Sequence, residues 1–363
     1  MKGLYVHIPF CQYICHYCDF VKRVPKNKEM IDQYLNALRK EIKSYEHHFS
    51  SIETIYIGGG TPSMLDLEQL TYLFESLRTI HPVEYTIEVN PESYTKEKGL
   101  LFKSFGINRV SLGVQTFNQH LLSYLNRGHT NDMVFETIHH LHEIGISNIS
   151  IDLIYAIPGQ TIENLKEDLQ IVSQLNIKHI SCYTLILEEK TYFYHQYLKG
   201  LFHEVEEDLE AMMYELVTDT LKKQGFEHYE ISNYAKNNHY SMHNMIYWTL
   251  GEYIGVGLGA HGFINGYRTY NERSLPKYVI EPLKEKVYQE QKDFIQDELI
   301  FGLRKIQGIN VNEIEKKYHI NLFDLYPSLK DKIELGLVEL DHGYLKLTSK
   351  GLLLGNQVFM VFI

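Results

Sequence analysis

Three of the four cysteines of this chain lie in one eight-residue stretch, CQYICHYC, near its start. Cys11, Cys15 and Cys18 are separated by three and then by two residues, and the fourth cysteine, Cys182, is remote. A structural zinc site normally takes four protein ligands in a tetrahedral arrangement, so these three would leave it incomplete. Three soft thiolates on one short loop suit instead a 4Fe-4S cluster in which one iron has no protein ligand. The spacing therefore predicts a cluster whose open iron binds a small molecule.

Two further stretches carry residues that suit a ligand. In IYIGGGTPS, the run Gly58 to Gly60 would let the backbone approach a ligand closely, because side chains there would block it. In IEVNPE, Glu88 offers two acceptor oxygens that suit the hydroxyls of a ribose. Taken alone, the glycines could form only a turn, and Glu88 could be a surface carboxylate. Their position after predicted strands gives them more weight.

Apolar runs rich in β-branched and aromatic residues alternate with amphipathic helical patterns along the first half of the chain. The predicted strands are residues 3–7, 52–57, 85–89, 109–113, 148–153 and 179–187. The predicted helices are residues 31–45, 67–80, 96–105, 131–143 and 162–174. Right-handed crossovers would arrange about six such units as a parallel sheet curved into an open, partial β/α barrel, an α/β fold.

The polar motifs fall in the loops that follow these strands. The cysteines follow the first strand, GGGTP the second, EVNPES the third and VQTF the fourth, and Asp152 lies near the end of the fifth. Function in such barrels collects at the carboxyl ends of the strands. We therefore expect these segments to form one site.

Composition limits the remaining possibilities. The chain has 363 residues, 44% of them hydrophobic and 22% charged, which allows one large core or two domains. A net charge of −11 argues against nucleic acid as a partner. The opening residues MKGLYVHIPF lack a cleavage site, and no apolar run approaches the roughly 20 residues of a membrane span. We expect a cytoplasmic protein, where the reducing conditions keep the thiols free for a metal.

The chain divides by pattern into three parts. Residues 1–225 form the barrel, closed by an acidic amphipathic helix over 204–224 with Met212, Leu216 and Leu221 on its inner side. Residues 226–292 form a connecting segment. Residues 293–363 predict a small winged-helix-like α+β domain, with a hairpin around His342 and an apolar end that packs on the barrel or contacts a protein or membrane surface. This domain has eight Lys or Arg against ten Asp or Glu, which again disfavours nucleic acid.

The stretch LYVHIPFCQYICHYCDF resembles the signature of radical S-adenosylmethionine proteins, and more narrowly of the family related to oxygen-independent coproporphyrinogen oxidase. IYIGGGTPS, IEVNPE, SLGVQTF, LNRGH and IDLIYAIPGQT stand in that family's order, and the similarity covers nearly the whole chain. The resemblance implies that the amino and carboxylate groups of S-adenosylmethionine chelate the open iron. It also implies that an electron from the reduced cluster splits the sulfonium to give a 5'-deoxyadenosyl radical.

The resemblance further implies a set of cofactor residues. The methionyl amino group would lie against the turn formed by Gly59, Gly60 and Thr61, and Glu88 would bind the ribose. The remaining cofactor residues would be Tyr5, Tyr17, Gln115, Arg127 and Asp152. Arg127 has forked donors that suit a carboxylate. Some relatives hold a second S-adenosylmethionine, and the sequence does not decide between one and two.

The residue two positions after the third cysteine distinguishes two branches of the family. Oxidases carry another cysteine two residues after the third ligand, whereas Phe20 stands there in this chain. The CDF form resembles the heme chaperone branch, whose members deliver heme to respiratory and other hemoproteins. SMHNMIYW, followed by GEYIGVGLGAHG, resembles the HN-x-x-Y heme motif of that branch. His243 would ligate the heme iron, with His261 as the alternative ligand, although a single histidine could also be a hydrogen-bonded core residue.

The sequence and its resemblance thus predict a heme chaperone that holds a 4Fe-4S cluster, S-adenosylmethionine and heme. Its partners would be heme-accepting hemoproteins and an electron donor. The sequence predicts no membrane span and leaves a peripheral contact with a membrane as an alternative. The alternative is an enzyme that uses the radical to oxidatively decarboxylate a porphyrinogen or to modify another tetrapyrrole. A third interpretation is a scaffold whose cysteines hold zinc.

Overall fold

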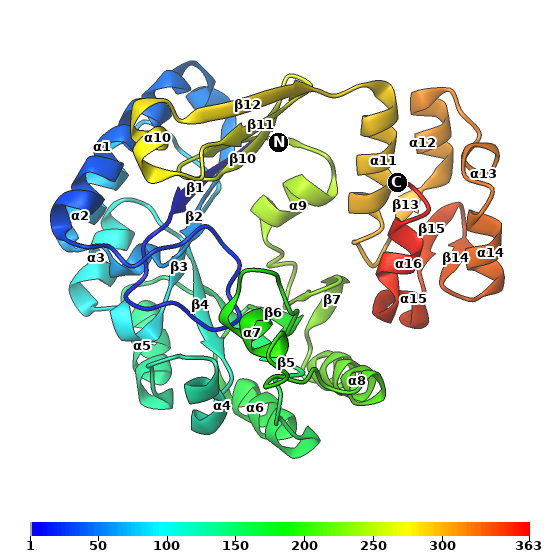
Figure 1. Cartoon of the computed structure of the whole chain (residues 1–363), viewed down its shortest axis with the longest axis horizontal. Coiled ribbons are helices and arrows are strands. Elements are labelled where there is room, and N and C mark those ends of the chain that lie inside the picture. The colour runs from blue at the N-terminus through cyan, green and yellow to red at the C-terminus, as the bar shows by residue number, and fades with distance from the viewer. Residues whose placement is uncertain (1) are drawn as a thin grey trace.

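Six parallel strands in chain order form the centre of a curved sheet in the computed structural model, which describes residues 2–363 (Figure 1). These strands are β1 (Lys2–Ile8), β2 (Ile52–Gly59), β3 (Glu84–Val89), β4 (Arg109–Gln115), β5 (Asn148–Tyr155) and β6 (His179–Thr184). Each strand pairs in parallel with its neighbour in sequence. The predicted α/β fold with an open parallel barrel is confirmed.

Helices cover the outer face of this sheet. They are α1 (Lys28–Ser44), α2 (Leu67–Glu75), α3 (Lys96–Ser104), α4 (Gln119–Tyr124), α5 (Asn131–Glu143), α6 (Ile162–Gln174) and α8 (Glu207–Lys223). Each of the first six begins at an Asn, Asp or Thr whose side chain accepts a hydrogen bond from the backbone N–H three residues on. Each such cap stabilises its helix by about 1 kcal/mol. The apolar stripes of these helices pack on the sheet to form the main core.

The inner side of α8 differs from the expectation at one residue. Met212 is 52% exposed, whereas Met213 is fully buried beside Val217 and Leu221. Adjacent residues of a helix point about 100° apart, so an error of one residue in the assigned face moves the side chain from core to solvent.

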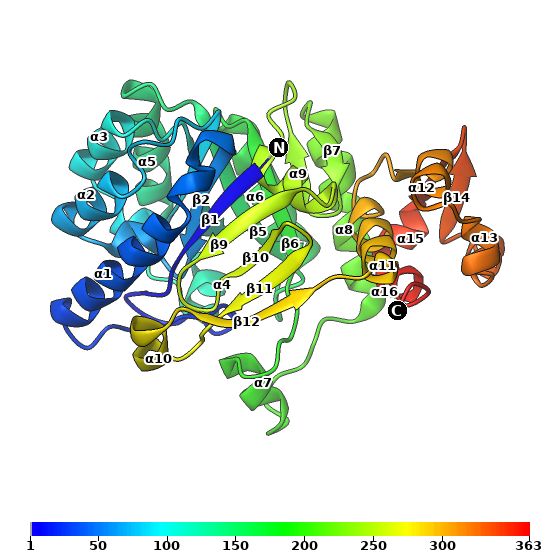
Figure 2. The ribbon, with the colours of Figure 1, turned by 90° about the horizontal axis from the view of Figure 1, so that it is seen from above.

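The segment predicted to connect two domains instead extends the sheet at both edges. Beside β1 lies β9 (Glu252–Val256), in parallel, followed by the antiparallel strands β10 (His261–Ile264), β11 (Tyr267–Asn271) and β12 (Leu283–Tyr288). Beyond β6, the sheet continues with β8 (Asn233–Ala235) and β7 (Glu227–Glu230), both antiparallel. Residues 226–292 therefore complete the curved sheet of twelve strands (Figure 2).

Helix α9 (Met242–Trp248), which carries the HN-x-x-YW motif, lies within the concave side of the sheet (Figure 1). Its first turn is fixed to β3, because Glu84 accepts hydrogen bonds from the backbone N–H groups of Met242 and His243, at 3.1 and 2.9 Å. Two peripheral helices remain: α7 (Tyr192–Tyr197), in the segment between β6 and α8, and α10 (Leu275–Ile280), which contacts α1.

The C-terminal part has a core of its own and lies at one end of the molecule (Figure 2). Its helices are α11 (Gln291–Gly302), α12 (Val311–Tyr318), α13 (Leu322–Leu325), α14 (Leu329–Glu334), α15 (Ser349–Leu353) and α16 (Gly355–Phe359). Its strands β13 (Ile309–Asn310), β14 (Val338–Asp341) and β15 (Tyr344–Leu347) contain the predicted hairpin. From the apolar end of the chain, Val358 and Phe362 are buried in this core, whereas Leu352 packs against both this core and the main core of the barrel. No helix within residues 2–363 is long and apolar enough to cross a membrane.

Candidate functional site

The loop that carries the three cysteines follows β1 and is held at both ends by backbone hydrogen bonds. The N–H of Cys11 donates to the carbonyl of Arg23 at 3.0 Å, and the N–H of Arg23 donates to the carbonyl of Pro9 at 2.7 Å. Farther along, the N–H of His16 donates to the carbonyl of Leu125 at 3.1 Å. The loop is therefore closed at its base and tied to the segment after α4.

The thiols of this loop are shielded from water to different degrees. Cys11 is buried, and Cys15 and Cys18 are half-buried. Burial raises the pKa of Cys11 to about 11 and also raises the pKa of Cys18, because a thiolate is poorly solvated there. Metal binding to these residues would release their protons.

The glycine turn after β2 packs directly against the cysteine loop. The N–H of Gly60 donates to the carbonyl of Ile8 at 2.8 Å, and the N–H of Thr61 donates to the carbonyl of Phe10 at 2.8 Å. A Cβ at Gly60 would lie 2.7 Å from the Phe10 oxygen and 2.9 Å from Cys11 Sγ. The sequence predicts that these glycines allow the approach of a ligand, and Gly60 also allows the close approach of the two protein segments.

The cysteines and most of the predicted cofactor residues line one cavity of about 470 Å³, here called the cysteine cavity. The predicted site residues on its wall are Cys11, Cys15, Tyr17, Cys18, Gly59, Gly60, Thr61, Glu88, Gln115, Arg127 and Asp152. Apart from Arg127, which follows α4, they come from the ends of β1 to β5 or the loops directly after them, as expected for a parallel barrel. A cavity of this size is typical of small-molecule sites.

The donor set fits a multi-iron cluster. Within residues 2–363, no three His, Cys, Asp or Glu side chains are grouped as ligands of one metal ion. The three cysteines instead border a shared cavity. In a 4Fe-4S cluster each thiolate binds a different iron, so the sulfur atoms need not converge on one point.

Two buried arginines on the wall of the cysteine cavity give it positive charge. Arg127 donates through Nη2 to the carbonyl of Gly113 at 2.6 Å, and its Nη1 lies 3.7 Å from Cys15 Sγ. The Nε atoms of Arg127 and Arg109 have no hydrogen-bond partner in the described part of the chain. Unpaired buried donors of this kind suit an anionic group, such as the carboxylate of S-adenosylmethionine.

Two carboxyl groups face the same cavity. Glu88 accepts hydrogen bonds from the Tyr56 hydroxyl at 2.8 Å and from the Gly59 N–H at 2.9 Å, and Asp152 accepts one from Ser111 at 3.2 Å. Burial raises the pKa of Glu88 to about 7 and that of Asp152 to about 6. Each carboxylate oxygen has a second acceptor site, so both groups can still bind hydroxyl donors.

Tyr5 and His243 are the predicted site residues that do not line the cysteine cavity. The Tyr5 hydroxyl pairs with Nδ1 of His7 at 2.9 Å. His243 is 1% exposed, with Nδ1 2.8 Å from the Thr54 hydroxyl and Nε2 2.8 Å from the Tyr247 hydroxyl. His243 is the predicted heme ligand, and its imidazole is buried with both nitrogens paired, so iron binding would have to break one of these bonds.

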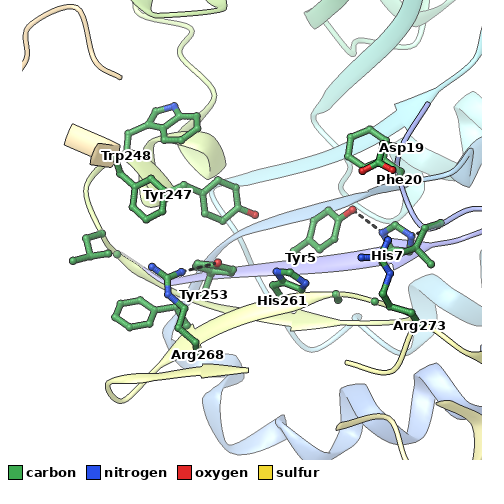
Figure 3. Close-up of a pocket in the computed structure, with 17 residues that line it drawn as sticks. Tyr5, His7, Asp19, Phe20, Tyr247, Trp248, Tyr253, His261, Arg268 and Arg273 are labelled. Carbon is green, nitrogen blue, oxygen red and sulfur yellow. Dashed lines mark hydrogen bonds between the residues drawn. The ribbon is translucent and has the colours of Figure 1, made fainter. Parts of the chain in front are cut away.

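A second cavity of about 440 Å³, here called the aromatic cavity, is shown in Figure 3. Its aromatic wall consists of Tyr5, Phe20, Tyr247, Trp248, Tyr253, Phe263 and Phe301, and its polar residues include His7, His261, Arg268 and Arg273. Asp19 and Phe20 line both cavities. The sequence motifs indicated Tyr247, Trp248 and His261. They did not indicate Arg268 and Arg273, because in the sequence an arginine that lines a cavity cannot be told from one on the surface of a strand.

The fold and the cysteine cavity define a radical S-adenosylmethionine protein. The model of the Radical SAM superfamily matches residues 5–172, and that of the HemN C-terminal domain matches residues 289–354. The structure of coproporphyrinogen III oxidase (HemN) from Escherichia coli, described as a radical SAM enzyme, superimposes with a TM-score of 0.86. That comparison covers 99% of this chain and 89% of the oxidase, at 25% identity.

The most informative relatives are curated heme chaperones named HemW. The protein from Bacillus subtilis is 40% identical over 100% of this chain and 99% of its own length. The protein from Lactococcus lactis is 39% identical over 100% of this chain and 97% of its own length. This chain therefore belongs to the HemW family within the HemN-like radical SAM proteins.

Proposed function

We propose that this protein is a heme chaperone, which binds a 4Fe-4S cluster, S-adenosylmethionine and heme and delivers heme to hemoproteins, including respiratory ones. The observation that carries the proposal is the similarity to HemW heme chaperones over the full length of the chain. It is supported by the cysteine cavity, where three thiols and two arginines with unpaired donors lie together.

In this proposal, Cys11, Cys15 and Cys18 hold the cluster, which would supply an electron to bound S-adenosylmethionine. The chain positions that cofactor with the turn at Gly59, Gly60 and Thr61. The side chains proposed to complete its site are Tyr17, Glu88, Gln115, Arg127 and Asp152. Tyr5 acts from the neighbouring aromatic cavity, where it orients His7 beneath the glycine turn.

Arg127 provides the main electrostatic contribution to this site. Its guanidinium is fixed by Gly113 and lies beside Cys15, so it can neutralise both a thiolate and a bound carboxylate without rearranging. Glu88 and Asp152 retain acceptor sites for hydroxyl groups. Because burial raises the pKa of both, binding of a cationic sulfonium nearby would favour their ionised forms.

The alternative function is a radical enzyme acting on a tetrapyrrole, as an oxygen-independent coproporphyrinogen III dehydrogenase. The TM-score of 0.86 with HemN favours it, because the whole scaffold is shared. Phe20 favours the chaperone, since it stands where the oxidases of the family carry a further cysteine. Its side chain is 65% exposed between the two cavities. Zinc at the cysteines remains the third interpretation.

The proposed organisation and setting follow from the same function. We place the radical domain at residues 1–225, the segment with the heme motif at 226–292 and the winged-helix-like domain at 293–363. The last boundary is supported by the separate C-terminal core, which begins at Ile295. The protein would act in the cytoplasm, take electrons from a donor protein and meet its acceptors in solution or at a membrane surface, without binding nucleic acid.

One experiment tests these readings together. Protein reconstituted anaerobically should contain about four iron and four sulfide per chain. S-adenosylmethionine should change the paramagnetic resonance spectrum of the reduced cluster, and heme should bind stoichiometrically with no conversion of coproporphyrinogen. Turnover of coproporphyrinogen would favour the enzyme over the chaperone function. Stoichiometric zinc without iron would contradict both functions and favour the zinc scaffold.

A further inference from the structure

The aromatic cavity shares Asp19 and Phe20 with the cysteine cavity, and Tyr5 is its only residue assigned to the proposed S-adenosylmethionine site. It is assembled by segments that are distant in sequence: β1, the end of the cysteine loop, α9, β9, β10, β11 and the first helix of the C-terminal part, α11. Its wall is mainly aromatic, with Tyr247 and Tyr253 in edge contact at a centroid distance of 4.7 Å. A wall of this kind binds a large, flat, apolar molecule.

Figure 3 shows His261 projecting into this cavity between Arg268 and Arg273. Within residues 2–363, neither ring nitrogen of His261 has a hydrogen-bond partner, and the ring is held edge-on to Tyr270 at 4.8 Å between centroids. His261 is the first residue of β10 and is exposed. His261 is therefore an available imidazole at the border of an apolar cavity.

The other histidines near the cavity are already engaged. His7 is 4% exposed, and its two ring nitrogens pair with the Tyr5 hydroxyl at 2.9 Å and the carbonyl of Val21 at 2.7 Å. His243 is equally buried and paired at both nitrogens. Only His261 could bind a metal without losing a hydrogen bond.

Of the two arginines that line the cavity, Arg268 already has an ionic partner, whereas Arg273 has none among residues 2–363. Arg268 forms an ion pair with Asp297 and lies over the ring of Phe263, 4.7 Å from its centroid. Arg273 lines the cavity and has no ion pair or hydrogen bond to any of residues 2–363. An unpaired guanidinium at the border of an apolar cavity suits a carboxylate, which it can bind through two hydrogen bonds.

We propose that the aromatic cavity is the heme site, with His261 as the iron ligand and Arg273 as the partner of a heme propionate. This inference rests on the proposed function, because it locates the heme of the chaperone. Heme matches the cavity in three respects: it is flat and apolar, it carries an iron that accepts imidazole, and it bears carboxylates at one edge. Iron-free tetrapyrroles are also flat and also bear carboxylates, but they have no iron to accept the imidazole.

The position of these residues also suits release. His261 and Arg273 are both exposed, so the iron ligand and the propionate partner lie where an acceptor protein can reach them. Asp19 and Phe20 stand at the border between this cavity and the cysteine cavity, because they line both. Heme would thus be held apart from the thiols of the cluster loop.

The test is a titration of reconstituted protein with heme, followed by the Soret spectrum, for the wild type and matched variants. His261→Ala should weaken heme binding at least about tenfold and remove the imidazole-type spectrum, because loss even of a group that only supports a metal ligand costs 10–100-fold. Arg273→Gln should weaken binding about threefold or more, with the difference shrinking at high salt. The exposed residues His342 and Arg78 supply the controls His342→Ala and Arg78→Gln, which should bind heme as the wild type does.

Three comparisons make the outcome decisive. Protoporphyrin without iron should bind equally to the wild type and His261→Ala; an equal loss for both ligands would mean that His261 packs and does not ligate. If His243→Ala, with its cluster intact, loses the imidazole spectrum while His261→Ala keeps it, the ligand is His243 and the inference is wrong. A wild type that binds no heme would overturn the proposed function itself, whereas heme binding that neither His261→Ala nor Arg273→Gln affects would overturn only this site.

Discussion

Replacing Gly60 by Ala tests how the glycine turn and the cysteine loop depend on one another. The backbone of Gly60 does not require a positive φ, so the effect of the added methyl group is steric. That group would lie 2.7 Å from the Phe10 oxygen and 2.9 Å from both the Ile8 oxygen and Cys11 Sγ. Two of these three atoms belong to the backbone and cannot rotate away.

The structure gives the size of the effect by two routes. If the loop stays in place, overpacking costs about 1–3 kcal/mol. If it moves, the hydrogen bonds from Gly60 to Ile8 and from Thr61 to Phe10 are lost, at about 1 kcal/mol each. Either route destabilises the fold by about 2 kcal/mol, which a domain of ordinary stability survives. The movement of Cys11, however, should lower the amount of cluster that the protein retains.

The assay is urea denaturation of the cluster-free protein, together with iron and sulfide analysis after reconstitution. Gly128→Ala is the matched control, because the nearest atom to its added methyl group would be the Tyr13 hydroxyl at 3.3 Å, at the end of a side chain that can move. It should change stability by less than about 1 kcal/mol. Wild-type stability and full iron content in Gly60→Ala would refute the packing argument.

Three further predictions concern the cluster, the cofactor and the fold. Cys15→Ala should abolish the cluster, whereas Cys182→Ala, which removes a buried thiol that does not line the cysteine cavity, should retain it. Iron analysis measures the cluster content, and loss in both variants would contradict the assignment. Arg127→Lys should keep the cluster but weaken the effect of S-adenosylmethionine on its paramagnetic resonance spectrum, because the forked donors are lost; an unchanged effect would exclude carboxylate binding by Arg127. Burial raises the pKa of Glu41 from 4.5 to about 7, so the folded state binds this proton more tightly than the unfolded state does. The free energy of unfolding should therefore fall by about 3 kcal/mol as the pH rises from 4.5 through 7. Urea denaturation at about pH 5 and pH 8 should show this loss of stability in the wild type and not in Glu41→Gln. The same change in unfolding free energy in both proteins would refute the prediction.

The centre of the fold was predictable because its signals are local. Each of β1 to β6 is an apolar run of six to eight residues, and the helices between them carry an apolar stripe with a cap at the start. Strands β7 to β11 have three to five residues, too few to show a period, and their pairing joins segments far apart in the chain. The parallel pair of β1 with β9 is the clearest case, since nearly 250 residues separate Lys2 from Glu252.

The sequence by itself determined the chemistry that the cysteine cavity can perform. The spacing of Cys11, Cys15 and Cys18 and the placement of polar motifs after successive strands are properties of the chain, because parallel strands bring their carboxyl ends to one edge. Only the tertiary structure decided the state of each histidine. His243 and His261 both stand in motifs of the chain, but the first is enclosed between Thr54 and Tyr247 and the second faces a cavity built from distant segments. A side chain's availability depends on what surrounds it in space, and the neighbours of these two rings come from elements that the local sequence does not specify.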